Sequence, residues 1–150
     1  MTNFAQHLSA AAAADADHPA VRLDDVTLSY GALDAAVARC AGLLRARGVS
    51  PGDRVGLQMP NVPYFPVVYY GALRAGAVVV PMNPLLKGRE VAYYLSDSGA
   101  KLMVAWQDFA DAARDGSEQA DAECIIAAPG EFDELLAGSE PVDEVVAPPD

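Results

Sequence analysis

Few residues of this 150-residue chain are suited to acid, base or nucleophilic chemistry, and their spacing matches no catalytic set. The two histidines are His7, in a stretch with helical spacing, and His18, which precedes a proline in an expected turn. The sequence G-x-S-x-G occurs at residues 48–52, GVSPG, but it follows an expected helix and precedes an expected strand, whereas a hydrolase nucleophile elbow joins a strand to a helix. We therefore assign neither histidine a catalytic role and predict no catalytic residue in this chain.

Metal ligands are also not indicated. The acidic residues form two close pairs, Asp15 with Asp17 and Asp24 with Asp25, in expected turns. Charged side chains in such turns are normally solvated. Cys40 and Cys124 are far apart in apolar surroundings, so they form neither a CxxC redox pair nor a zinc cluster. We predict no metal site, and we interpret both cysteines as buried free thiols of a cytoplasmic protein.

Nucleotide-binding sequences are missing as well. Neither G-x-G-x-x-G nor G-x-x-x-x-G-K-[ST] occurs. Open α/β sheets bind ligands at the carboxyl ends of their strands, which here points to the loops Met59 to Tyr64, Pro81 to Lys87 and Trp106 to Asp108. The first two of these loops contain prolines, whereas a phosphate cradle needs free backbone N–H groups. We predict no cofactor-binding residue in this chain alone.

Composition and charge restrict the class of protein. A hydrophobic content of 52% excludes disorder throughout, and a net charge of −11 disfavours nucleic acid and anionic lipid as partners. The first residues lack a basic region followed by an apolar core, so no signal peptide is indicated. Residues 55–73 carry no charge, but Pro60, Pro63 and Pro66 interrupt them, so we predict no membrane span.

Helical and strand patterns alternate along the chain. A short helix around Leu8 precedes a hairpin over 21–30 with an Asp24–Asp25 turn. Further helices are expected at 30–47, 66–75, 89–98 and 108–114, and strands at 54–59, 77–80, 101–105 and 124–128. Strand 77–80 is continuously apolar, which is typical of a strand covered on both faces. The pattern predicts an α/β fold, a doubly wound and mostly parallel sheet flanked by helices, with a small N-terminal hairpin.

The amino-acid composition of the chain changes after Pro129. Acidic residues mix with Pro and Gly, and only 132–136 has a helical pattern. We predict an α/β subdomain at residues 1–128 and an acidic, mobile linker or tail at 129–150. A sheet of this size exposes an edge strand, so we also expect self-association.

Aromatic residues suggest one possible ligand pocket. They are concentrated in two expected helices and just before the first of them, as Tyr64, Phe65, Tyr69, Tyr70, Tyr93 and Tyr94. Two tyrosine pairs on consecutive helices could line an apolar cavity, but neighbouring residues on a helix face different directions. We therefore favour core or interface packing for these side chains over ligand contact.

Two stretches resemble a known family. The stretch 73–83, LRAGAVVVPMN, resembles the second signature of the AMP-forming adenylating enzymes, and 28–33, LSYGAL, resembles the first. Ala32 replaces the usual glutamate of the first signature, which weakens a helix cap. Within these stretches we interpret Gly76 as a helix stop, Pro81 as a strand end and Asn83 as a side chain that holds the exit loop.

The residues that follow favour one branch of the family. Asn83, Pro84 and the stretch 94–101, YLSDSGAK, look more like acyl-CoA synthetases than like amino-acid adenylation domains. The resemblance implies that a carboxylic acid, favoured to be a fatty acid, reacts with Mg-ATP to an acyl-adenylate and is then transferred to coenzyme A. The family's phosphate loop and catalytic lysine have no counterpart in these residues. The chain therefore resembles an N-terminal fragment that is inactive alone and binds no ATP, Mg or coenzyme A.

Two alternatives remain open. The chain could be a non-catalytic α/β binding or assembly module that kept the architecture without the chemistry. It could also belong to an amino-acid or aryl-acid adenylating enzyme, which would differ only in the acid that it activates.

Overall fold

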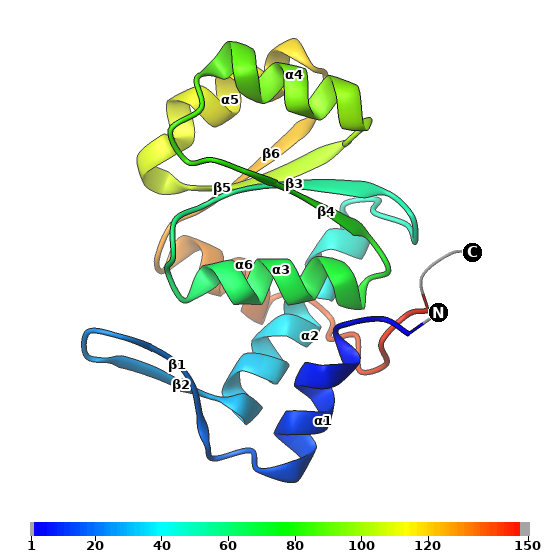
Figure 1. The fold of residues 1–150 in the computed structure, drawn as a ribbon, viewed down its shortest axis with the longest axis vertical. Helices are drawn as coiled ribbons and strands as arrows, with labels where there is room; N and C mark the ends of the chain where they lie inside the picture. The colour runs from blue at the N-terminus through cyan, green and yellow to red at the C-terminus, as the bar shows by residue number, and fades with distance from the viewer. Residues whose placement is uncertain (1, 148–150) are drawn as a thin grey trace.

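A computed structural model describes residues 2–147 as a parallel sheet between two helical layers (Figure 1). The sheet has the strand order β4-β3-β5-β6, and all neighbouring pairs are parallel. Its strands are β3 (Arg54–Gln58), β4 (Val78–Met82), β5 (Leu102–Trp106) and β6 (Glu123–Ala127). Because β3 lies between β4 and β5, the chain crosses over β3 after β4, as in a doubly wound sheet.

Helices cover both faces of this sheet, which confirms the predicted fold class. One layer contains α4 (Gly88–Ser98) and α5 (Ala110–Gln119), and the other contains α2 (Tyr30–Ala46), α3 (Tyr64–Arg74) and α6 (Glu131–Ala137). A 3₁₀ turn, η1 (Gln107–Phe109), precedes α5. The first helix, α1 (Gln6–Ala14), packs on α2. The hairpin β1 (Pro19–Leu23) and β2 (Val26–Ser29) projects from the body of the molecule.

Local sequence signals account for most element ends. The Ser29 hydroxyl accepts a hydrogen bond from the Ala32 N–H at 3.1 Å and so caps α2. Helix α3 begins at Tyr64, two residues before the predicted start, and Pro66 lies in its first turn, where no N–H is needed. Helix α5 extends to Gln119 instead of Arg114. In its last part Gly116 approaches Val91 so closely that a Cβ there would lie 2.5 Å from the valine Cβ.

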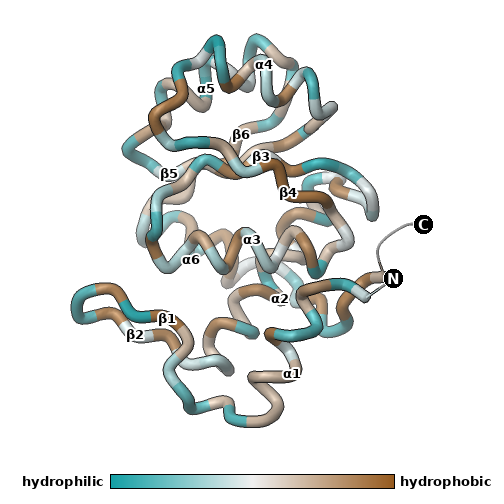
Figure 2. Tube along the Cα trace, viewed as in Figure 1, coloured by the Kyte–Doolittle hydropathy of each residue, from teal (hydrophilic) through white to brown (hydrophobic). Residues whose placement is uncertain are grey.

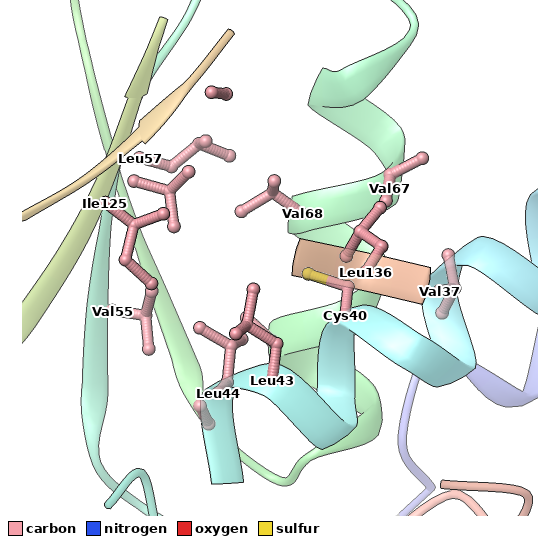
Figure 3. Packing of buried hydrophobic residues seen from close by; sticks show 14 of the residues in the cluster. Val37, Cys40, Leu43, Leu44, Val55, Leu57, Val67, Val68, Ile125 and Leu136 are labelled. Atoms are coloured by element: carbon pink, nitrogen blue, oxygen red, sulfur yellow. The ribbon is translucent and has the colours of Figure 1, made fainter. Parts of the chain in front are cut away.

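The larger hydrophobic core lies between α2, α3 and the sheet (Figure 3). Leu44, Val55, Leu57 and Val68 are almost completely buried there. A smaller core lies on the other face, beneath α4 and α5. Figure 2 shows the corresponding pattern, with hydrophobic residues along β4 and hydrophilic residues on the outer turns of α4 and α5.

Strand β4 is less covered than its sequence indicated. The apolar run predicted a strand covered on both faces, but β4 lies at one end of the described sheet, and the Val78 side chain is 48% exposed. Pro81 lies inside the strand, paired with Leu57, and does not mark its end. An edge strand tolerates proline because one of its edges carries no ladder hydrogen bonds.

The segment after Pro129 is not the mobile linker that we expected. Helix α6 buries Phe132 completely and Leu136 almost completely in the larger core. Farther along, the Val142 N–H donates to the Ala38 carbonyl at 2.9 Å, and the Val146 N–H donates to the Arg74 carbonyl at 3.0 Å. Two apolar residues at helical spacing, one carbonyl in the middle of α2 and one at the end of α3 therefore hold an acidic segment against the body. The division of the chain at residue 128 stays a prediction, and residues 148–150 lie outside the described part.

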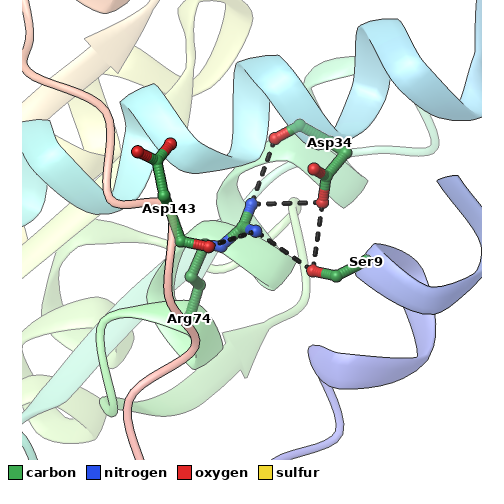
Figure 4. Close-up of polar contacts among 4 residues, drawn as sticks. All are labelled: Ser9, Asp34, Arg74 and Asp143. Carbon is green, nitrogen blue, oxygen red and sulfur yellow. Dashed lines mark hydrogen bonds and ion pairs between the residues drawn. The ribbon is translucent and has the colours of Figure 1, made fainter. Parts of the chain in front are cut away.

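A buried arginine joins this segment to two helices (Figure 4). The Arg74 side chain is 3% exposed and forms an ion pair with Asp34 on α2 at 3.1 Å. Its other terminal nitrogen donates to the Ser9 hydroxyl at 3.0 Å and to the Asp143 carbonyl at 3.2 Å. One guanidinium therefore holds α1, α2 and the C-terminal segment around the end of α3.

Candidate functional site

The loops at the carboxyl ends of the parallel strands lie at one edge of the sheet, as predicted. Met59 to Tyr64 follows β3, Trp106 to Asp108 follows β5, and Pro81 to Lys87 begins within the end of β4. The connection from β6 to α6 adds Pro129 and Gly130 to this edge. Any ligand site of this fold type is expected there.

A cleft of 430 Å³ opens beside this edge, between the hairpin and helices α3 and α6. Most of its lining is apolar: Leu23, Val26, Leu28, Ala36, Val62, Pro63, Val67, Pro129 and Leu136. Tyr64 and Trp106 also line it, with ring centres 6.0 Å apart. Behind them, the Phe132 ring meets Tyr64 edge to face at 5.6 Å. The volume lies in the range of small-molecule pockets.

The polar atoms of the cleft are mostly hydrogen-bonded to one another. The Tyr64 hydroxyl donates to an Asp133 carboxylate oxygen at 2.8 Å, and the Gly130 N–H donates to the same oxygen at 3.0 Å. The Trp106 indole N–H donates to Asp108 at 3.1 Å. Partial burial and the Asp133 carboxylate raise the pKa of Tyr64 to about 12, so its phenol stays protonated at neutral pH. The cleft therefore offers aromatic surface rather than reactive groups.

Gln58, at the end of β3, organises the neighbouring loop. Its side chain is completely buried, and its amide nitrogen lies 3.2 Å from the Pro84 carbonyl and 3.3 Å from the Leu86 carbonyl. Its amide oxygen has no hydrogen-bond partner among the described residues. Asn83 accepts a hydrogen bond from the Leu85 N–H at 2.9 Å, which agrees with our interpretation that this side chain holds the exit loop.

Three backbone N–H groups of these loops are not free to hold a phosphate group. A phosphate cradle needs several backbone N–H groups that point outward. Here the Val62 N–H donates to the Pro60 carbonyl, the Leu86 N–H to the Asn83 carbonyl, and the Gly130 N–H to Asp133. No group of three metal-ligating side chains occurs within residues 2–147. We therefore derive no step of ATP or metal chemistry from these residues.

Among the described residues, the lining of the cleft includes Asp24 but neither histidine and no other member of the acidic pairs. His7 stacks edge to face on Phe4, and His18 lies against Tyr30 and 4.0 Å from Asp15. Asp24, in the hairpin turn, adopts a left-handed backbone with φ of 50° and lines the rim of the cleft. The acidic pairs are exposed turn residues.

Both cysteines are free thiols. Cys40 is fully buried, and burial raises its pKa to about 12, so it remains a neutral thiol. Burial also raises the pKa of Cys124, which is only partly covered, contrary to the expectation that both are buried.

The two tyrosine pairs do not share a cavity. Tyr69 and Tyr70 on α3 pack at 5.5 Å and border the larger core. Tyr93 and Tyr94 on α4 lie on the opposite side of the sheet and are 66% and 42% exposed. Of the six aromatic residues singled out in the sequence, only Tyr64 lines the cleft.

Sequence reasoning missed Gln58 and Asp133, and it named the loop that begins at Trp106 without singling out the tryptophan itself. Trp106 is the only tryptophan of the chain and ends a core strand, and these two features could have identified it as a residue of the site. Asp133 lies three residues after Gly130, where an acidic side chain accepts from the residue before a helix. Gln58 carries no local signal, because its role depends on a loop 25 or more residues later.

Comparisons with known proteins place these residues in context. A family model described as AMP-binding enzyme matches residues 8–150. The long-chain-fatty-acid–CoA ligase FadD13 of Mycobacterium tuberculosis is 46% identical over 80 residues, which cover 53% of this chain and 16% of the ligase. A long-chain-fatty-acid–CoA ligase of Escherichia coli O157:H7 is 42% identical over 96 residues, covering 63% and 17% respectively.

A solved structure extends the similarity to nearly the whole chain. A benzoate CoA ligase from Burkholderia xenovorans LB400 has a TM-score of 0.91 and 30% identity, covering 99% of this chain and 31% of that one. The chain therefore spans about a sixth of the length of the two fatty-acid ligases and under a third of the benzoate ligase. Among the described helices, none has the length and apolar character needed to cross a membrane.

Proposed function

Because the chain belongs to the family of AMP-binding enzymes, we propose that it is the N-terminal part of an acyl-CoA synthetase. Such an enzyme activates a carboxylic acid with ATP and transfers the acyl group to coenzyme A. The observation that carries this proposal is the family match over residues 8–150. Both signature-like stretches lie at element boundaries, 28–33 at the start of α2 and 73–83 from the end of α3 through β4.

A fatty acid is the substrate that we favour. The two ligases named above for long-chain fatty acids share 46% and 42% of the aligned residues with this chain. An aromatic acid is the second candidate, because the benzoate ligase has a TM-score of 0.91. We retain the cytoplasmic location as a prediction.

Within this function, the 150 residues supply a scaffold. Gln58 and Asn83 hold the loop after β4, and the aromatic cluster around Tyr64 holds the connection from β3 to α3. We assign no contact with ATP, Mg or coenzyme A to these residues, because the N–H groups of Val62, Leu86 and Gly130 are already bonded within the loops. The chain alone is therefore inactive in adenylation.

Pyrophosphate release tests both parts of this proposal. We expect none from residues 1–150 with ATP, Mg and a panel of fatty and aromatic acids. A longer protein from the same gene should release pyrophosphate with at least one of these acids. Turnover by residues 1–150 would contradict the scaffold role, and the lack of a Ser/Thr/Gly-rich loop soon after Asp150 in the gene would contradict the synthetase.

A non-catalytic α/β binding module is the alternative from another class. It predicts that the gene ends near Asp150 and that the chain binds a specific partner tightly. Reading the gene past this point separates the two hypotheses before any assay is run.

A further inference from the structure

We infer that the cleft between the β1–β2 hairpin and helices α3 and α6 binds a small amphiphile with an apolar body and a cationic amine head. This inference goes beyond the proposed function, because neither ATP nor acyl transfer is involved. It concerns a site that the chain forms by itself, from residues of the hairpin, α2, α3, β5 and α6.

The shape of the cleft suits a small apolar body. Its volume of 430 Å³ exceeds the volume of a short alkyl chain. The hairpin forms one wall, and helices α3 and α6 form the wall that faces it. Val26 on the hairpin is 51% exposed and Leu23 is 38% exposed, although both face this hollow. A ligand between the hairpin and the body would remove this apolar surface from water.

The aromatic side chains of the cleft present apolar surface rather than free polar atoms. The Tyr64 hydroxyl and the Trp106 indole N–H are bonded to Asp133 and Asp108 respectively. A ligand that touches these rings therefore has no need to replace their hydrogen bonds. The ring faces also attract a cation when it lies over them.

Charge determines which head group fits. Among residues 2–147, the charged side chains that line the cleft are Asp24 and Asp133, and no Lys, Arg or His of this range lines it. Both carboxylates are solvent-exposed, and a carboxylate ligand would bring a third negative charge beside them, which is unfavourable. An ammonium group at the rim would instead be attracted by this negative charge. The cleft therefore selects against the acids that the proposed enzyme activates.

Three probes of equal chain length separate these possibilities. Octylamine, octanol and octanoate are each titrated into the 150-residue protein at neutral pH without nucleotide. Trp106 is the only tryptophan, so the intrinsic fluorescence reports directly on the cleft. We expect octylamine to bind roughly tenfold more tightly than octanoate, with octanol between them. Equal binding of octylamine and octanoate, or no change of emission with any probe, would overturn the inference.

Substitutions test which carboxylates attract the amine head group. Asp24→Asn keeps the left-handed turn, which Asn tolerates, and Asp133→Asn keeps an oxygen that can accept from Tyr64. In either variant we expect octylamine binding to weaken several-fold toward that of octanol. Asp25→Asn removes the same charge one residue away from the lining and is the matched control. An equal loss in the Asp25 variant would show that net charge, rather than the cleft, attracts the amine.

A space-filling variant tests the apolar part separately. Val62→Phe places a larger side chain in the cleft and should weaken octylamine and octanol alike. Unchanged affinity for both probes would place their binding elsewhere. Because no reaction is measured, failure of adenylation by the longer protein would leave this result intact.

Discussion

At the scale of single residues, the buried Gln58 shows why an amide was needed at the end of β3. Its N–H groups face carbonyl oxygens of the loop 83–86, and its completely buried position excludes water as a simple replacement. If the amide were rotated, its oxygen would face carbonyl oxygens, which fixes the orientation of the side chain. The residue therefore links the centre of the sheet to its carboxyl edge.

Gln58→Glu should destabilise the protein more than Gln58→Met does. Methionine leaves carbonyls of the partly buried loop 83–86 without their donor, at a cost of about 1 to 3 kcal/mol. Glutamate places a carboxylate against the same carbonyls, so its folded pKa rises above its unfolded value of about 4.3. Its penalty is therefore small below that pH and grows as the pH rises. Urea unfolding at about pH 5 and pH 7 should show this difference.

The methionine variant provides the control, because it has no titratable group at this position. Its loss of unfolding free energy relative to wild type should not vary with pH. Equal pH dependence in both variants would contradict the proposed contact between the new carboxylate and the loop carbonyls.

At the scale of elements, the C-terminal segment is held by specific contacts although its composition is that of a linker. Arg39 donates to the carbonyls of Ala137 and Ser139, and Arg74 donates to that of Asp143. The Asn3 side chain reaches the Val146 carbonyl at 2.8 Å. These contacts join the two ends of the described chain across the end of α3.

Arg74→Met should release the segment 139–147. The methionine retains much of the buried volume, but it leaves Asp34 without its partner and the Asp143 carbonyl without its donor. We expect a loss of about 2 to 3 kcal/mol, less than for a fully buried pair because Asp34 is partly exposed. Limited digestion with a glutamate-specific protease should then cut faster after Glu140 and Glu144.

Arg89→Met is the matched control, because Arg89 is an exposed arginine on α4, on the other face of the sheet. It should leave the digestion pattern unchanged. Cleavage that is equally slow in wild type and in the Arg74 variant would show that the remaining contacts hold the segment alone.

At the scale of the whole molecule, the described sheet ends in β4 on one side and β6 on the other. An edge strand carries unpaired N–H and C=O groups, which can pair with another chain. Pro81 interrupts part of the β4 edge, so Val78 and its neighbours are the more suitable pairing surface.

We predict that the 150-residue protein forms dimers or larger species through β4. Val78→Lys should shift it toward monomer, because the exposed position accepts a charge while strand pairing brings two such charges together. Val26→Lys, at a similarly exposed position on the hairpin, is the control. Sedimentation at high concentration measures the change. A wild-type protein that sediments as a monomer would exclude pairing through this edge.

The sequence alone determined the alternation of helices and strands and the hairpin, because these depend on local periodicity and on single residues at element ends, such as Ser29 and Gly76. It also determined the family resemblance, which depends on two short stretches. Tertiary structure decided the rest. Whether the apolar strand β4 is central or at the edge depends on strand order, which no local pattern encodes. The burial of Phe132 and the cleft between Tyr64, Trp106 and Asp133 depend on residues that are distant in sequence and meet only when the parallel strands align their carboxyl ends.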